Sequence, residues 1–470
     1  MNDAQIAQGR GLPGQVVAAI PTPAGMHRAV KMLTQFNLTQ LNVEIAKRRP
    51  ALARAADAAA AAVAVSLPWS TSATGILLVV WLGLLLPTLD AGRLRREIMT
   101  AAGGLPLVLV ALAALGMSWA DSWADVGMSQ RLAGLGGYLK LLCIPLLLAQ
   151  FRASPRGTWV IFGFLGAAVA LLVLSFGLTL IPDLPWRGKT VGVPVKDYIT
   201  QSGVFALCAF ALLGAAARAW RCRRPRTACA LAFLAMAFIA NIGFVETGRT
   251  TLAAIAVLVP LFGFRHFGWR GMAAAVVVGS VLAGGLWMSS PYLRERVTHA
   301  VEEVDLYRTE HAGTSAGLRL EFWRNSIAAV AKAPILGNGT GSIPEQLSAG
   351  RGFEPNGAYF GTVNPHNELL VTMIQLGLVG TLALLGLWIA HLLLFRGEGL
   401  ISWIGLVAVA ENIVGSLFNS HLSDFTQGWI YVLAVGALGG TVRRQAAPPQ
   451  ADSAPAQRSD LLAAKDLPHR

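Results

Sequence analysis

The sequence predicts an all-α integral membrane protein with about twelve transmembrane helices and one large loop. Its residues are 54% hydrophobic and 13% charged, whereas soluble domains carry about 25% charged residues. Long apolar runs alternate with short connections that hold most of the charge, which is the pattern of repeated membrane spans. One connection, residues 291–366, is much longer than the others, so we expect it to form a domain outside the membrane.

The composition excludes several classes of function. A net charge of +13 would suggest nucleic acid binding in a soluble chain. Here the basic residues lie mainly between apolar runs and form no patch interleaved with aromatic residues, so no nucleic acid partner is expected. The four cysteines have no CxxC spacing, and no HxxxH or HExxH motif occurs. The sequence therefore predicts no disulfide framework, no metal site and no cofactor.

The chain divides into five predicted parts. Residues 1–50 lack the apolar core of a cleaved signal peptide and are expected to be a cytoplasmic arm. Residues 51–290 hold nine apolar segments of spanning length, the loop 291–366 follows, and residues 367–443 hold three more. Residues 444–470 are rich in Ala, Pro, Gln and Ser and predict a disordered cytoplasmic tail. The predicted spans are residues 51–68, 73–89, 99–118, 132–151, 158–180, 200–217, 227–244, 250–265, 271–290, 367–395, 399–418 and 425–442.

The positions of the basic residues predict the orientation. Two short connections on the opposite side lack Lys and Arg: the acidic SWADSWADV (residues 118–126) and FNSHLSD (residues 418–424). Because basic connections face the cytoplasm, both termini are predicted inside and the long loop outside. The basic connections hold Arg93, Arg95, Arg96, Arg152, Arg156, Arg218 to Arg226, Arg265, Arg270, Arg396, Arg443 and Arg444.

The long loop contains one clear amphipathic helix. Apolar residues recur at helical spacing in SAGLRLEFWRNSIAAVAKA, residues 315–333. Thr314 or Ser315 can cap its start, and Pro334 marks its end. The glycine-rich segment ILGNGTGSIP, residues 335–344, follows and predicts turns.

Arginine residues on the outer side are the first candidates for chemistry. Arg249 lies at the junction of two apolar segments, where a guanidinium needs a partner. One interpretation is a salt bridge to Glu246. The other is that Arg249 faces a cavity at the membrane edge and holds an anionic group bidentately. Arg187 and Lys189, near the interfacial Trp186, have the reach to contact a lipid headgroup or a phosphate.

The amphipathic helix carries two further arginines. Arg319 is expected to project into the same cavity as Arg249, whereas Arg324 is expected to be exposed or paired with Glu321. An acidic cluster precedes this helix in the sequence, and a solvated helix face explains it better than a divalent cation site. Its residues are Glu302, Glu303 and Asp305.

The motif NPHNELL, residues 364–370, is the sharpest local feature. Asn364 before Pro365 predicts a helix N-cap followed by proline at the first helical position. His366 and Asn367 would then lie in the first turn of the tenth span. A helix N-terminus disfavours imidazolium and attracts anions. A neutral base beside an anion site suits the attack of a hydroxyl on a carbon whose leaving group is a phosphate. The alternative is that His366 is a capping or packing residue.

Together, these features resemble the O-antigen ligase family, the WaaL-type enzymes that share the Wzy-C region with O-antigen polymerases. The resemblance rests on some twelve spans, the large loop before the tenth, and the segments RLEFWRNSIAAVAKAPILGNGTGSIP and NPHNELLVTMIQLGLVG. It implies a GT-C-type glycosyltransferase fold with a large periplasmic loop domain. Such ligases transfer O-antigen from undecaprenyl diphosphate to a sugar hydroxyl of lipid A–core, without a metal, at the periplasmic face of the Gram-negative inner membrane.

The resemblance also implies roles for residues. His366 matches the essential histidine of the family, and Arg249 and Arg319 match its functional arginines, so these three are the predicted catalytic residues. Arg187 and Lys189 are placed by loop position only, as substrate-binding residues. We add three neighbours of the catalytic residues to this predicted substrate-binding set: Glu246, Asn364 and Asn367.

The resulting hypothesis is an inverting transfer in which His366 is the base and the arginines stabilise the departing diphosphate. We expect a monomer surrounded by membrane lipids. The first alternative is an O-antigen or exopolysaccharide polymerase, and the second is a protein O-oligosaccharyltransferase. A membrane transporter is a different class of function. It is disfavoured because the spans hold few charges other than Lys140 and show no inverted repeat.

Overall fold

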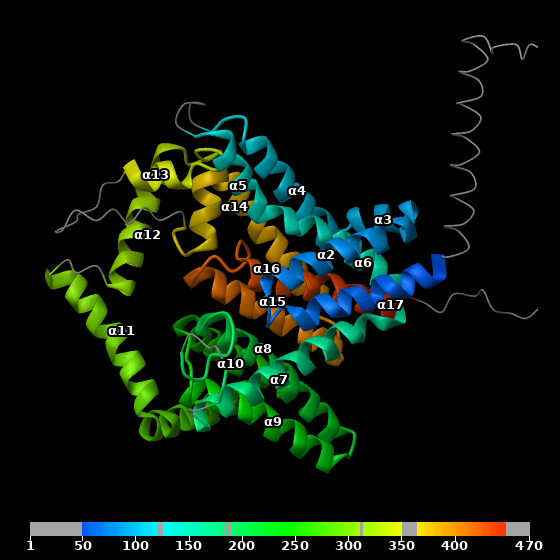
Figure 1. Cartoon of the computed structure of the whole chain (residues 1–470), viewed down its shortest axis with the longest axis vertical. Helices are drawn as coiled ribbons and strands as arrows, with labels where there is room; N and C mark the ends of the chain where they lie inside the picture. Colours follow the sequence, from blue (N-terminus) through cyan, green and yellow to red (C-terminus); the bar gives the residue numbers. More distant parts are fainter. Residues whose placement is uncertain are drawn as a thin grey trace, which may run out of the picture. The chain divides into compact units, whose positions relative to one another are not determined.

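The computed structural model is helical through almost all of the part that it describes (Figure 1). The described residues are 49–120, 126–181, 184–186, 190–310, 314–349 and 364–447. Within them there is no strand, only an isolated bridge between Thr190 and Val193. Ala53–Arg470 form one compact unit; of the other unit, Met1–Leu52, only residues 49–52 are described. The predictions for residues 1–48 and 448–470 therefore lie outside the described residues.

The first described helix comprises residues 49–66. Those that follow, in chain order, are α2 (Thr71–Leu85), α3 (Ala91–Ile98), α4 (Ala101–Gly116), α5 (Met128–Leu139), α6 (Cys143–Ala153), α7 (Thr158–Leu180), α8 (Tyr198–Arg221), α9 (Pro225–Phe244), α10 (Arg249–Ser289), α11 (Pro291–Glu310), α12 (Ser315–Lys332), α13 (Ile343–Ala349), α14 (Glu368–Leu394), α15 (Leu400–Phe418), α16 (Phe425–Leu433) and α17 (Gly439–Ala446).

Among the described residues, nine helices are long and apolar enough to cross a membrane, or up to ten if the bent pair α3–α4 forms one span. The structure thus supports a multi-pass membrane protein but not the predicted number of twelve spans. The first predicted span, residues 51–68, is helical but is not a candidate span. It contains a buried carboxylate, Asp57, which accepts hydrogen bonds from Gln150 Nε2 (3.0 Å) and Ser154 Oγ (2.6 Å).

The eighth and ninth predicted spans are the two halves of α10. Gly268, at φ 70° and ψ −163°, breaks the helix between them. A Cβ atom added at Gly263 would lie 2.6 Å from Cβ of Ala275, and one added at Gly279 would lie 3.0 Å from Val259. Both contacts join residues that are nearly equidistant from the break. The two halves therefore pack against each other in opposite directions.

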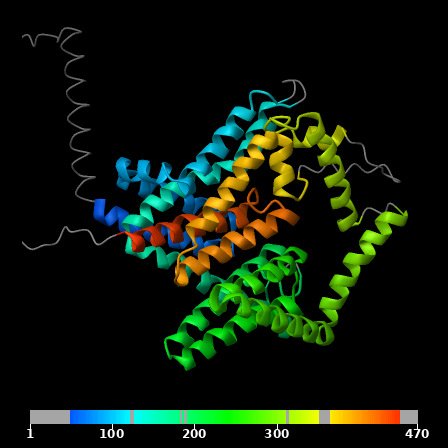
Figure 2. The same ribbon diagram turned by 180° about the vertical axis from the view of Figure 1, so that it is seen from behind.

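The tenth predicted span is broken in the same way. Gly377, at φ 60° and ψ −155°, divides α14 into a short first part and a longer second part (Figure 2). The preceding glycine-rich segment bonds to the backbone groups that the break leaves free. Asn338 N–H donates to the Ile374 carbonyl at 2.7 Å, and Leu378 N–H donates to the Pro334 carbonyl at 2.9 Å. Since unpaired backbone groups are costly within a membrane, this segment is a structural partner of α14.

The close approach of this segment to α14 requires glycine. Gly337 has φ 75°, and a Cβ atom there would lie 2.5 Å from the backbone of Gly377. The sequence correctly predicted turns in this segment. It did not predict that the segment contacts the break in α14.

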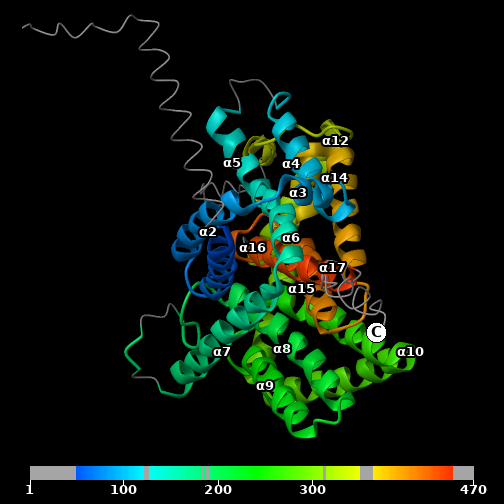
Figure 3. The same ribbon diagram turned by 90° about the vertical axis from the view of Figure 1, so that its right-hand side faces the viewer.

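The most buried candidate spans are α8, α15 and the helices from Phe425 to Ala446. α8 lies beside α9 and also contacts α10 and α15 (Figure 3). α15 ends next to the start of α14, and α12 packs on α14. The start of α10, the start of α14 and the end of α15 thereby become parts of one site.

Candidate functional site

α12 brings the predicted site residues together. Arg319, Phe322 and Trp323 are three and four residues apart, so they lie on one face of the helix. The rings of Phe322 and His366 are stacked, with 6.4 Å between centroids and 28° between planes. Trp323 Nε1 donates to the Pro365 carbonyl at 3.1 Å. Arg319 therefore lies about one helical turn, roughly 5 Å, from the aromatic residues that contact the His366 loop.

The loop before α14 differs from the prediction. The helix begins at Glu368, and its N-cap is Asn367, whose Oδ1 accepts from Leu370 N–H at 3.2 Å. Asn364 is not the cap; its Oδ1 accepts from His366 N–H at 2.9 Å. His366 has φ 53°, a left-handed conformation that delays the start of the helix. The predicted helix start was therefore wrong, because an Asx turn at Asn364 precedes the true cap.

Asn419 orients the imidazole of His366. His366 Nδ1 lies 2.9 Å from Asn419 Oδ1. The backbone N–H of Ser420 donates to the same Oδ1 at 3.0 Å, so this atom is the amide oxygen, which only accepts. Nδ1 therefore carries the proton of this bond, and in the neutral ring Nε2 keeps its lone pair. This tautomer is the one that a general base at Nε2 needs.

Both predicted substrate-binding asparagines of this loop have contacts that hold it in place. Asn364 Oδ1 also accepts from the hydroxyl of Ser420 at 2.6 Å. Asn367 Nδ2 donates to the Leu417 carbonyl at 2.9 Å. The loop before α14 is thus fixed to the end of α15, and a direct contact of either asparagine with substrate stays a prediction.

Two buried ionisable residues, Glu368 and Lys140, anchor residues 419–424, the turn that contains Asn419, the hydrogen-bond partner of His366. Glu368 accepts from the N–H and the hydroxyl of Ser423, at 3.0 Å and 2.6 Å. Lys140, which the sequence showed as a charge within a span, donates to three successive carbonyls of the turn at 3.0, 2.8 and 2.6 Å, those of Leu422, Ser423 and Asp424.

Arg249 forms a bidentate ion pair, but not with the predicted partner. Its Nη1 and Nη2 each lie 2.8 Å from a carboxylate oxygen of Glu303. Glu246 instead accepts from the Tyr292 hydroxyl at 3.0 Å. The interpretation that Arg249 pairs with Glu246 was wrong, because α11 supplies both a hydroxyl for Glu246 and a carboxylate for Arg249. The other interpretation, in which Arg249 holds an anionic group, stays a prediction. Glu303 is therefore an ion-pair partner of Arg249, whereas the sequence suggested only a solvated helix face.

Glu303 connects three helices. Its carboxylate accepts from Ala316 N–H, in the first turn of α12, at 3.0 Å. Its backbone carbonyl accepts from the hydroxyl of Thr314, the N-cap of α12, at 2.8 Å. The hydrogen bonds from Arg249 hold the pKa of Glu303 below its usual range. A carboxylate on α11 thus joins the start of α10 to the start of α12.

Arg319 is a second cation at this edge of the site, and the charge of Glu303 acts on it without an ion pair among the described residues. In the part of the chain that the structure describes, it makes no hydrogen bond or ion pair. Burial, and next the positive charge of Arg249, lower the pKa of its guanidinium. Glu303 is ion-paired with Arg249, so Arg319 leaves an excess positive charge at this edge of the site, which favours an anion. Arg324, in contrast, is exposed, as predicted.

Two residues that were not singled out in the sequence complete this edge of the site. The guanidinium of Arg296 lies 4.6 Å from the ring centroid of Tyr198, at the start of α8. Burial raises the pKa of the nearby Glu246 carboxyl, while the Tyr292 hydrogen bond and the charge of Arg296 oppose this shift. Glu246 therefore interacts with Tyr292 and Arg296 of α11, whereas Arg249 pairs with Glu303.

Two of the predicted substrate-binding residues, Arg187 and Lys189, lie outside the described residues. Within the described ranges, no group of three or more His, Cys, Asp and Glu side chains is arranged to hold a metal ion. The described arrangement is a half-buried histidine with a defined tautomer that stacks on Phe322 of α12, one helical turn from Arg319, while Arg249 pairs with Glu303 at the start of the same helix. It can remove a proton and stabilise a developing anion.

The comparisons agree with the motifs. Residues 231–385 match the Wzy_C family model, which is described as O-Antigen ligase. The matched range includes Arg249, Arg319 and His366. No curated protein matches the chain. The match confirms the resemblance to the O-antigen ligase family and supports a ligase- or polymerase-type function on a polysaccharide or lipid-linked substrate.

Proposed function

We propose that this protein is an O-antigen ligase that transfers O-antigen from undecaprenyl diphosphate to a sugar hydroxyl of lipid A–core, which completes lipopolysaccharide. One observation carries the proposal: His366, held at Nδ1 by Asn419, stacks on Phe322 of α12, one helical turn from Arg319, within the region that matches the family. The reaction takes place at the periplasmic face of a Gram-negative inner membrane, on a GT-C-type fold with both termini in the cytoplasm.

His366 acts as the general base. Its Nε2 accepts the proton of the acceptor hydroxyl while that oxygen attacks the anomeric carbon of the donor sugar. The new glycosidic bond forms as the bond between this carbon and the diphosphate oxygen breaks. The electron pair leaves with undecaprenyl diphosphate, and attack from the opposite face inverts the anomeric carbon. The hydrogen bond to Asn419 keeps the ring oriented and stabilises the imidazolium that forms.

The arginines stabilise the leaving group. A guanidinium has five N–H donors, so Arg249 can bind Glu303 through two nitrogens and still donate to a phosphate oxygen. Arg319 has all of its donors free of described protein partners, and we assign it the main contact with the diphosphate. Because arginine supplies the positive charge, the proposed mechanism uses no metal, and excess chelator is expected to leave transfer unchanged.

A reconstituted transfer assay tests this proposal against the polymerase alternative. Purified protein is given a lipid-diphosphate-linked glycan together with either lipid A–core or a second lipid-linked repeat unit. A ligase extends lipid A–core, and a polymerase extends the lipid-linked chain. Transfer to the lipid-linked unit alone would replace the ligase proposal with the polymerase.

Substitution of the base gives the first specific prediction. His366→Ala is expected to lower the transfer rate by about 10²- to 10⁴-fold, the usual contribution of a general base. His299→Ala is the matched control, since His299 is exposed on α11, and it should retain normal activity. Near-normal transfer by the His366 variant would remove this residue from the mechanism.

A further inference from the structure

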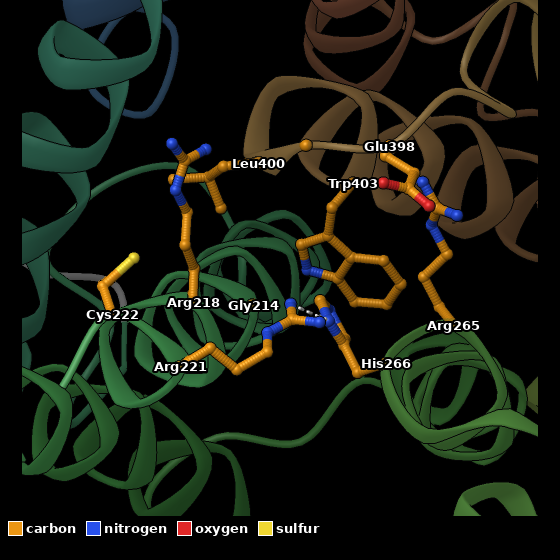
Figure 4. Close-up of a pocket in the computed structure, with 10 residues that line it drawn as sticks. Gly214, Arg218, Arg221, Cys222, Arg265, His266, Glu398, Leu400 and Trp403 are labelled. Carbon is orange, nitrogen blue, oxygen red and sulfur yellow. Dashed lines mark hydrogen bonds between the residues drawn. The ribbon is translucent and has the colours of Figure 1, made fainter.

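A cationic pocket lies at the opposite end of α15 from Asn419. It has a volume of about 320 Å³, which is at the small end of the range for ligand sites. Its residues come from the C-terminal part of α8, from the end of the first half of α10, and from the connection before α15 together with the first turn of α15 (Figure 4). They include Arg218, Arg221, Arg265, His266, Glu398 and Trp403.

The charge of this pocket is unbalanced. Three arginines line it, but the lining holds one carboxylate, Glu398, which is exposed and forms no ion pair among the described residues. Arg218 has no hydrogen bond or ion pair within the same described ranges. Arginine remains charged at all relevant pH values, so the pocket is cationic.

Two of the arginines are held in position by the protein. Arg221 Nη2 lies 3.1 Å from His266 Nδ1 (Figure 4). A guanidinium only donates, so the imidazole accepts this bond and the rest of the Arg221 fork stays available. Arg265 donates to the carbonyl of Gly397. A guanidinium that is already oriented loses less entropy when it binds an anion.

The surroundings of the pocket are those of a membrane surface. Trp220, next to Arg221, is 65% exposed, and Trp269, just beyond the break in α10, is 67% exposed. Exposed tryptophans are typical of the headgroup level of a membrane. α15 has 19 residues, so the pocket and the turn with Asn419 are about 28 Å apart along it. This distance is close to the thickness of the hydrocarbon core, about 30 Å.

We propose that this pocket binds a phosphate-bearing anion at the membrane surface opposite the candidate active site. The ligand is the phosphate of an anionic lipid headgroup or a soluble phosphate, and both would be bound by the guanidinium groups of Arg218, Arg221 and Arg265. This inference does not depend on the proposed transfer reaction.

Lipid binding by the full-length protein tests the proposal. Delipidated protein in a neutral detergent is titrated with phosphatidylglycerol, phosphatidylcholine or inorganic phosphate, and bound ligand is counted by native mass spectrometry. Arg218→Gln, Arg221→Gln and Arg265→Gln are combined in one variant. We expect this variant to bind phosphatidylglycerol at least about tenfold more weakly than the unmodified protein.

A variant with the same change in charge is the control. Arg93, Arg95 and Arg96 are exposed on α3, and their replacement by Gln should change the affinity by less than about twofold. Preference for phosphatidylglycerol over phosphatidylcholine assigns the ligand to a lipid, and binding of inorganic phosphate alone assigns it to a soluble phosphate. An equal loss in both variants, or no loss in either, would overturn the proposal. A melting temperature near that of the unmodified protein shows that the pocket variant is folded.

Discussion

At the scale of single residues, the candidate site depends on which nitrogen of His366 carries the proton. Asn419 Oδ1 accepts from Nδ1 and so keeps Nε2 as the basic atom. Asn419→Ala removes this acceptor and allows the other tautomer. We expect transfer to fall by about 10- to 100-fold, as when residues that orient metal-bound histidines are replaced. The measurement is the initial rate of transfer with the defined donor and lipid A–core.

A second variant separates orientation from mere packing. Asn419→Asp keeps an acceptor oxygen beside Nδ1 and should restore most of the activity. A carboxylate also stabilises the imidazolium, so the acidic limb of the pH–rate profile should move to higher pH. Equal losses in the Ala and Asp variants, with an unchanged pH profile, would show that Asn419 has no orienting role.

Arg319 gives a prediction about geometry rather than charge. Arg319→Lys keeps one positive charge but loses the planar fork that binds two phosphate oxygens together. We expect a loss of transfer of about tenfold or more, while Arg324→Lys, an exposed site on the same helix, should have no effect. The rates of both variants are compared at saturating donor. Full activity of Arg319→Lys would show that Arg319 makes no bidentate contact with the diphosphate.

The sequence predicted the residues with unusual chemistry but not their partners. His366, Arg249 and Arg319 were recognisable because each is a titratable or charged residue in an unusual setting, supported by the family resemblance. Their partners lie on other elements: Asn419 is 53 residues from His366, and Glu303 is 54 residues from Arg249. Asn419 lies in FNSHLSD, residues 418–424, which indicated only the orientation of the chain in the membrane. No local pattern identifies such contacts, because the packing of helices creates them.

At the scale of elements, the sequence predicted helices better than their interruptions. The start of α12 at Thr314 and its end before Pro334 are correct, because a cap and a proline act locally. The break at Gly377 was not predicted, since glycine is common in membrane helices. What decides the break is the contact with residues 335–344, which replaces the lost helical hydrogen bonds.

This break leads to a prediction about stability. Gly377→Ala would place a side chain at φ 60° and a Cβ atom 2.3 Å from the Ile335 carbonyl oxygen. The backbone conformation, φ 60° and ψ −155°, is essentially restricted to glycine and costs roughly 1–3 kcal/mol in another residue, so we expect a melting temperature lower by several degrees and weaker transfer. In Gly386→Ala, on the same helix, the new Cβ atom meets only Leu105 Cδ1 at 3.7 Å. That control should melt at or slightly above the original temperature. Equal melting of both variants would mean that the break tolerates side chains.

At the scale of the whole molecule, composition was enough to predict a helical multi-pass membrane protein, but not the number of spans. A span was predicted wherever an apolar run was long enough, and residues 51–68 met that test. The buried Asp57 in this run bonds to residues of α6 and its C-cap. Among the described residues the helix in this run is not a candidate span by length and composition, α3–α4 counts only as a bent pair, and the eighth and ninth predicted spans count as the one broken helix α10.

The predicted orientation can be tested with the cysteines of the chain. Cys222 is exposed and lines the cationic pocket, whereas Cys143 and Cys208 are buried. Cys229→Ser leaves Cys222 as the exposed thiol among the described residues. If basic connections face the cytoplasm, a membrane-impermeant maleimide should label Cys222 only after the cells are lysed.

The same experiment needs a site on the opposite side of the membrane. Val301 is 60% exposed on α11, in the loop that we place in the periplasm. In the background with Cys222 and Cys229 replaced by Ser, Val301→Cys should be labelled in intact cells whose outer membrane has been made permeable. Labelling is read as a mass shift of the purified protein. Labelling of Cys222 but not of the Val301 variant before lysis would invert the topology and place His366 on the cytoplasmic side, where the proposed ligase reaction does not take place.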